Sequence, residues 1–162
     1  MKNTLIRSLL ACAALGLAGA QAHAQTTVTD PWMRPTVAEQ KATGLFLQLQ
    51  SAKGGRLVSA RTPAAGITEI HEMAMEGDVM KMRAIPSLEL PAGKPVALKP
   101  GGHHLMLFQL RQPLKVGDTV PLQLVIQSAD GKATETVDVN VPVRLMTATK
   151  PAHGGHGGHH GH

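Results

Sequence analysis

After residue 24 the chain consists of short apolar or alternating runs that glycine, proline, aspartate and lysine interrupt. Runs of this kind predict β-strands, because alternate residues of a strand point to opposite faces of a sheet. The predicted strands are Thr26–Asp30, Gly44–Gln50, Arg56–Arg61, Thr68–Met73, Val79–Ala84, Val96–Leu98, His103–Leu110, Thr119–Ser128 and Ala133–Val141. No long segment of this part has the 3.6-residue apolar period of a helix.

These elements predict an all-β domain over residues 25–149. Two packed antiparallel sheets, as a β-sandwich or a flattened barrel, bury such strands economically. Turn residues between the runs support this arrangement, and Glu76-Gly77-Asp78 in particular predicts a hairpin between two of the strands. The glycine- and histidine-rich tail, residues 150–162, has nothing to pack into a core and is predicted to be disordered without a ligand.

Residues 1–24 have the organisation of a signal peptide. Lys2 and Arg7 precede an apolar stretch, Leu9 to Ala20, and Ala22-His23-Ala24 matches the small-x-small cleavage pattern. We therefore expect a periplasmic protein whose mature chain begins at Gln25. The apolar stretch is shorter than the ~20 residues of a membrane span, and no later segment approaches that length, so no membrane span is predicted.

Cys12, the single cysteine, leaves one alternative open. Leu9-Leu10-Ala11-Cys12 weakly resembles a lipoprotein cleavage box, and cleavage there would leave a lipid-anchored protein. Cleavage after Ala24 is favoured because it leaves a full apolar segment ahead of the cut. The mature chain would then have no cysteine, which excludes disulfides, thiolate metal sites and a blue-copper electron-transfer centre.

Composition excludes further classes of function. The signal segment removes two of the 16 basic residues, which leaves a small positive excess over 11 acidic ones. The basic residues are scattered, and two Phe and one Trp offer few rings for base stacking, so nucleic-acid binding is not expected. Ser59 lacks the glycine-flanked turn of a hydrolase nucleophile, and no glycine-rich phosphate loop is present, so an enzyme is not expected either.

Histidine and methionine gather in three segments, residues 70–75, 79–83 and 101–106. Residues two apart on a strand share a face, so His104 and Met106 form one pair of neighbours. If the first two segments form the hairpin and the third lies beside them, four side chains converge near the rim of the sheet. This predicted metal site consists of His71, Met82, His104 and Met106.

Two imidazoles and two thioethers favour Cu(I), because thioethers are soft ligands and the set lacks carboxylates. Zinc, which rarely uses methionine, is the second choice. Thioethers cannot be oxidised to disulfides, so such a site suits a cargo that must leave again. Met73, Met75 and Met80 are predicted to be neighbouring or alternative ligands.

Other residues near these segments are given structural roles. Strand alternation turns His103 away from the predicted site, and Met33 and Met146 are interpreted as core residues. Glu69 and Glu72 are expected to point to opposite faces as solvated carboxylates.

The tail carries a second candidate metal site. Imidazoles without sulfur suit Cu(II), Ni(II) or Zn(II) better than Cu(I), and the glycines between them let the backbone fold around an ion. The alternative, a purification tag, fits less well because the histidines are interspersed with glycine. The candidate Cu(II) ligands are His153, His156, His159, His160 and His162.

The ligand spacing resembles that of a known family. His71, ten residues, Met82, twenty-one residues, His104, one residue and Met106 match the motif of the periplasmic PCuAC-type copper chaperones. Ile70-His71-Glu72-Met73 and Met80-Lys81-Met82-Arg83 resemble the family around the motif, and the resemblance extends from about Val28 to Val143.

The resemblance implies a cupredoxin-like β-sandwich or Greek-key barrel that binds Cu(I) at these four residues. It further implies delivery of copper to the dinuclear centre of cytochrome c oxidase, with the oxidase's copper-bearing subunit and Sco-type assembly proteins as partners. The His-rich extension is associated with a Cu(II) site in this family. Two alternatives remain open: a periplasmic copper-sequestering protein, and a structural adhesion or interaction module with incidental histidines. A monomer is expected.

Overall fold

The computed structural model describes residues 25–146, and this part of the chain is built from strands without a helix. It accordingly contains no helix long and apolar enough to cross a membrane. The strands are β1 (Thr26–Met33), β2 (Ala42–Ser51), β3 (Gly55–Arg61), β4 (Ala65–Glu76), β5 (Val79–Ile85), β6 (Leu88–Leu90), β7 (Pro95–Leu98), β8 (His104–Leu110), β9 (Thr119–Ser128) and β10 (Thr134–Pro142).

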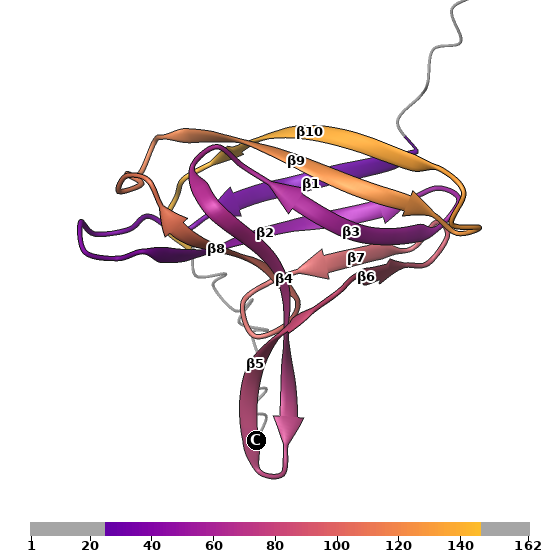
Figure 1. The fold of residues 1–162 in the computed structure, drawn as a ribbon, viewed down its shortest axis with the longest axis horizontal. Coiled ribbons are helices and arrows are strands. Elements are labelled where there is room, and N and C mark those ends of the chain that lie inside the picture. The colour runs from indigo at the N-terminus through magenta and orange to yellow at the C-terminus, as the bar shows by residue number, and fades with distance from the viewer. Residues whose placement is uncertain (1–24, 147–162) are drawn as a thin grey trace, which may run out of the picture.

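The strands form two open sheets that face each other as a sandwich (Figure 1). One sheet has the order β1-β2-β8-β4-β5, with β7 pairing to β2 beyond the end of β8. The other has the order β10-β9-β3-β6. The predicted all-β sandwich is therefore confirmed, with two separate sheets rather than a closed barrel.

The core lies between the two sheets and follows from strand alternation. In β9 buried and exposed residues alternate from Thr119 onward, as expected for a strand with one face on a core. In the first sheet Leu45, Leu105 and Ile70 lie side by side on three neighbouring strands and are all buried. Because the side-chain period is two, the residues next to them in sequence point to the outer face.

The nine predicted strands are all present, with differences at their ends. β1 continues to Met33 through an irregularity between Thr29 and Trp32, where Asp30 has a φ of 46°. This irregularity lets Pro31 remain within the strand, because a bulge does not require every backbone N–H. The prediction missed β6, whose three residues lie between Pro86 and Pro91.

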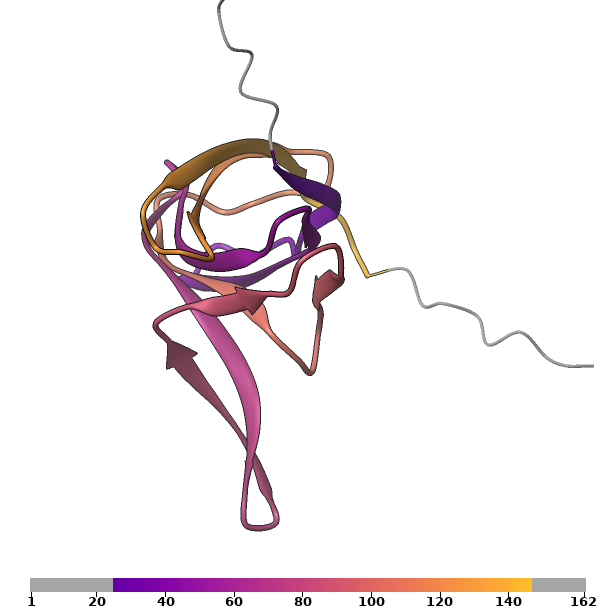
Figure 2. The ribbon, with the colours of Figure 1, turned by 90° about the vertical axis from the view of Figure 1, so that its right-hand side faces the viewer.

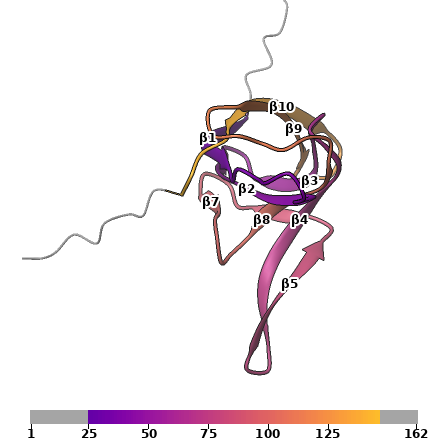
Figure 3. The same ribbon diagram turned by 90° about the vertical axis from the view of Figure 1, so that its left-hand side faces the viewer.

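The hairpin predicted at Glu76-Gly77-Asp78 is confirmed: β4 and β5 pair from Ile70–Ile85 to Glu76–Val79. Figure 1 shows it projecting well beyond the sandwich, and the two side views agree (Figures 2 and 3). The predictions for residues 1–24 and for the tail histidines lie outside the described residues.

Candidate metal centre

The two candidate histidines lie at the root of this hairpin. β8 pairs with β4 on the side opposite β5, and the last pair between them is His71 with His104. Their ring centroids are 5.7 Å apart. Both side chains lie on the outer face of the sheet, yet each residue is only 6% exposed. The two histidines of the predicted rim site are therefore buried, whereas Met82 is 47% exposed.

The contacts of His104 define which of its nitrogens is available. Nδ1 lies 2.9 Å from the carbonyl oxygen of Gly102, which can only accept a hydrogen bond. We therefore assign the ring proton to Nδ1, so that in the neutral ring the lone pair is on Nε2. Nε2 lies 3.1 Å from the thioether sulfur of Met82. Two electron-pair donors from β8 and β5 thus face each other.

The ring of His71 is also held by a hydrogen bond, but through its other nitrogen. Its Nε2 lies 2.7 Å from Glu69 Oε2, so this N–H donates a hydrogen bond to the carboxylate. Its Nδ1 is buried and has no hydrogen-bond partner in the described structure. Histidines that bind metals commonly donate one N–H to a carboxylate or carbonyl group and offer the other nitrogen to the metal. The arrangement of both histidines fits that pattern.

A hollow of about 270 Å³ opens beside His104. Its lining includes Met82, Met106 and Met73, so three methionines share one hollow with His104. The ring of His71 lies next to that of His104. Met73 and Met82 are directly opposite each other on β4 and β5, and Met106 is opposite Glu69.

Aromatic rings continue the outer face on both sides of the histidine pair. The Phe46 ring centroid lies 6.3 Å from that of His104, and the Phe108 centroid lies 5.8 Å from that of His71. Gly44 makes room for Phe46, because a Cβ at Gly44 would lie 2.8 Å from Phe46 Cζ. The histidines are therefore flanked by apolar groups that limit the access of water.

The structure brings the four predicted ligands into one region and adds Met73 to them. Met75 and Met80 lie farther along the hairpin, opposite each other. His103 is on the other side, 3.7 Å from Glu72, which confirms that it turns away from the site. Met33 is fully buried, as predicted for a core residue. The same interpretation is wrong for Met146, which is 59% exposed because it follows the last strand pairing.

Sequence reasoning missed the part played by Glu69. It was expected to be a solvated carboxylate, whereas it contacts His71. The expectation that Glu69 and Glu72 face opposite ways is confirmed, since Glu72 pairs with Arg83. The spacing Glu69-x-His71 was the available signal, because residues two apart on a strand share a face.

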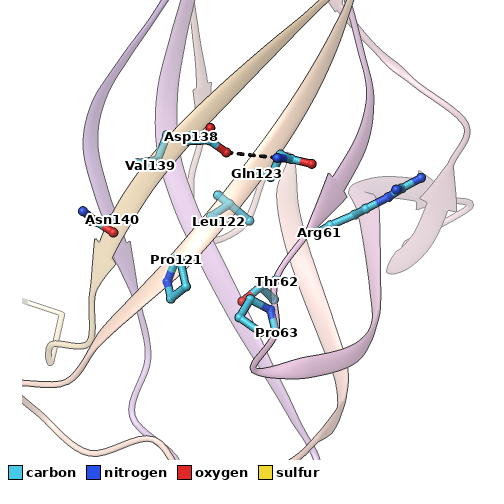
Figure 4. Close-up of a pocket in the computed structure, with 9 residues that line it drawn as sticks. All are labelled: Arg61, Thr62, Pro63, Pro121, Leu122, Gln123, Asp138, Val139 and Asn140. Carbon is cyan, nitrogen blue, oxygen red and sulfur yellow. Dashed lines mark hydrogen bonds between the residues drawn. The ribbon is translucent and has the colours of Figure 1, made fainter.

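The described residues offer no cluster of the ligands that harder metal ions prefer. Residues 25–146 contain no group of three or more His, Cys, Asp or Glu side chains that could hold a metal ion. A second hollow, of about 520 Å³, lies across the ends of β3, β9 and β10, where Gln123 bonds to Asp138 (Figure 4). Its lining has no His, Met or Cys. The His–Met cluster is therefore the candidate metal centre.

Three comparisons show which known proteins this chain resembles. The family model described as "Putative lipoprotein LpqE-like" matches residues 26–143. "Putative lipoprotein Lxx21020" of Leifsonia xyli subsp. xyli is 30% identical over 159 residues, covering 89% of each chain. The Cu(I) form of DR1885 from Deinococcus radiodurans is 30% identical, with a TM-score of 0.56 over 78% of this chain and 83% of that one.

A further solved structure supports the fold alone. The apo PCuAC domain from PmoF1 has a TM-score of 0.60 at 19% identity, covering 75% of this chain and 95% of that chain. The cupredoxin-like sandwich expected from the sequence resemblance is thereby confirmed.

Proposed function

The chain belongs to the LpqE-like family, and from this premise we propose that it is an exported copper carrier that binds Cu(I) through His71, Met82, His104 and Met106. The match to proteins described as lipoproteins supports export. The signal-peptide pattern of residues 1–24 supports the periplasm as the destination.

One observation carries the proposal. His104 Nε2 and Met82 Sδ face each other at 3.1 Å, and the buried Nδ1 of His71 has no partner nearby. A buried polar atom without a partner costs about 1–3 kcal/mol, and two facing lone pairs repel each other. A cation that accepts the electron pairs of His104 and Met82 removes their repulsion, and one that also reaches His71 Nδ1 removes the other penalty, which supports a soft ion at this place.

The chemistry of the ligands favours Cu(I) over other ions. Imidazole and thioether are neutral and suit a soft monovalent ion, whereas zinc prefers thiolate, imidazole and carboxylate. The Cu(I)-bound structure of DR1885 gives a copper precedent in a relative that is 30% identical. Neutral ligands also hold the ion without releasing protons, which suits a cargo that must be handed on.

The motif resemblance favours delivery of the copper to the dinuclear centre of cytochrome c oxidase. Its copper-bearing subunit and Sco-type assembly proteins would be the partners. The tail histidines His153, His156, His159, His160 and His162 would collect Cu(II). These histidines also favour the second candidate function, sequestration of excess copper in the periplasm.

The test of the metal site is an anaerobic Cu(I) titration against a chromophoric competitor. It uses the chain from Gln25 with the five tail histidines replaced by serine, and the same chain with Met82→Leu and Met106→Leu. Leucine keeps volume and hydrophobicity but removes sulfur. We expect one tight equivalent, weakened at least tenfold in the double variant.

Met146→Leu is the matched control, because Met146 is an exposed methionine that does not line the hollow beside His104. It should keep the tight equivalent unchanged. No tight equivalent in the parent chain would overturn the proposed function.

The destination of the copper is tested separately, in a strain from which the gene for this protein is deleted. Under copper limitation, a delivery protein predicts an oxidase that lacks copper. A sequestering protein predicts normal oxidase copper and growth failure at high copper, so the two candidate functions give opposite results.

A further inference from the structure

Within residues 25–146, the outer half of the β4–β5 hairpin is an arm to which no third strand pairs. β4 pairs with β8 only as far as His71, whereas its pairing with β5 continues to Glu76. Figures 1 and 2 show this arm extending away from the sandwich. The candidate metal centre therefore sits where the arm leaves the sheet, and one face of the arm continues directly from it.

That face carries a ladder of methionines. Met73 is opposite Met82, and the next pair on the same face is Met75 opposite Met80. Directly opposed residues have Cβ atoms about 4.5–5.5 Å apart, so the two thioethers of each pair can meet. Met75 is 60% exposed and Met80 49%, so both members of the outer pair are open to solvent; in the inner pair Met82 is 47% exposed and Met73 is half-buried.

The other face of the arm has a different chemistry. Arg83 donates to Glu72 at 2.8 Å, and Lys81 donates to Glu76 at 2.6 Å. These cross-strand ion pairs help to hold together two strands that would be only marginally stable alone. Among the described residues the methionine face of the arm contributes no ion pair, and exposing large apolar side chains to water is unfavourable. Five of the eight methionines nevertheless lie on this outer face, namely Met73, Met75, Met80, Met82 and Met106.

We propose that Met75 and Met80 form a second, weaker Cu(I) site through which copper enters and leaves the His–Met centre. This inference rests on the proposed function, since it assigns the route to the same cargo. Two thioethers bind Cu(I) more weakly than a set that includes two imidazoles, so the ion is driven inward at equilibrium. The exposed pair is also where the ligands of a recipient protein can reach the ion first.

The spacing of the ladder suits such a transfer. Successive pairs on one face of a strand are about 7 Å apart, at 3.4 Å per residue. Methionine is unbranched and flexible, so the Met73–Met82 pair can bridge this distance between the outer pair and His104. Cu(I) keeps its oxidation state at each exchange, the thioethers stay neutral, and no proton is released.

Binding is tested by NMR of the methionine methyl groups during anaerobic Cu(I) addition. The chain begins at Gln25, with its five tail histidines replaced by serine. The first equivalent should shift the signals of Met82 and Met106, and the second those of Met75 and Met80. The second equivalent should be lost in the Met75→Leu/Met80→Leu variant, while the first remains.

The route is tested by stopped-flow transfer of Cu(I) to bathocuproine disulfonate, a chelator that takes up Cu(I). We expect the same double variant to release copper about tenfold more slowly with unchanged affinity of the first equivalent. Met146→Leu, an exposed thioether outside the arm, should release copper at the parent rate. Leucine keeps the apolar surface, so a slower release identifies sulfur rather than hydrophobic docking as the cause.

The proposal is overturned if the Met75 and Met80 signals do not respond to a second equivalent, or if the double variant releases copper at the parent rate. Absence of the first tight equivalent from the parent chain is a different result. It would remove the proposed function itself, whatever the arm does.

Discussion

At the scale of the residue, the candidate centre depends on how its histidines are held. Glu69 and the Gly102 carbonyl each accept a hydrogen bond from one imidazole N–H, at 2.7 Å and 2.9 Å. The opposite nitrogens, His71 Nδ1 and His104 Nε2, are thereby left as electron-pair donors. Hydrogen-bond partners of this kind fix ring orientation and increase the basicity of the ligand.

Glu69→Gln is therefore expected to weaken Cu(I) binding about 10- to 100-fold, because the amide is a weaker acceptor for His71 Nε2–H. Competitor titration measures the change. Glu72→Gln is the matched control: Glu72 lies on the same strand but pairs with Arg83 on the other face. Equal losses in the two variants would show that general charge, rather than the contact with His71, is responsible.

His104→Ala tests the burial of the site. His104 is 6% exposed, and its Nδ1–H donates a hydrogen bond to the Gly102 carbonyl, so the residue also contributes to packing. Its removal leaves a cavity and a free carbonyl, with an expected cost of about 2 kcal/mol in the free energy of unfolding of the metal-free chain. Urea denaturation measures it.

Met106→Leu serves as the comparison for His104→Ala, because it conserves volume and should cost less than about 1.5 kcal/mol. If both variants unfold at the same urea concentration as the parent, the packing around His104 contributes little to stability.

At the scale of the element, strand existence followed from alternation, whereas strand ends and register did not. β6 was missed because three residues between prolines are too few to show a period. β1 was ended at Asp30 because Pro31 predicts a break, and the irregular pairing there is a tertiary feature. Turn residues, by contrast, located the β4–β5 hairpin correctly.

Gly55, at the start of β3, shows how closely the second sheet is packed. Its φ is 147°, and an added Cβ would overlap the carbonyl oxygen of Gln127 on β9. Gly55→Ala is therefore expected to lower the free energy of unfolding by more than about 2 kcal/mol, because backbone cannot move aside as a side chain can. Thermal or urea unfolding measures the loss.

Gly93→Ala is the matched control for Gly55→Ala. Gly93 also has a positive φ, 68°, but an added Cβ there would meet nothing within 4 Å. It should cost only about 1–2 kcal/mol, the penalty for a side chain in left-handed backbone. Equal losses would attribute the effect at Gly55 to backbone conformation alone.

At the scale of the whole molecule, the sandwich supports an outer-face site and a projecting arm. Its core lies between the sheets, so the outer face can carry polar and soft ligands without loss of the core. The site therefore depends on the sandwich for rigidity, while the arm gives it an exposed extension.

The N-terminus of the exported mature protein is a prediction at this scale. Cleavage after Ala24 predicts a mature protein that begins at Gln25, whereas cleavage before Cys12 predicts a lipid-modified cysteine at the N-terminus. The family description as lipoproteins makes this comparison important. Intact-mass measurement of protein from the producing cell separates the two, and we expect the unmodified Gln25 form.

The sequence by itself determined the all-β class and the hairpin, and it indicated four candidate soft ligands. These features are local, since alternation, turn residues and the spacing of His and Met can be read within short segments. Only the tertiary structure decided that His71 faces His104, that both are buried, that Glu69 holds His71, and that Met75 and Met80 form an exposed pair. The reason is that register between strands distant in sequence depends on packing of the whole core, and a one-residue shift would turn these side chains to the other face.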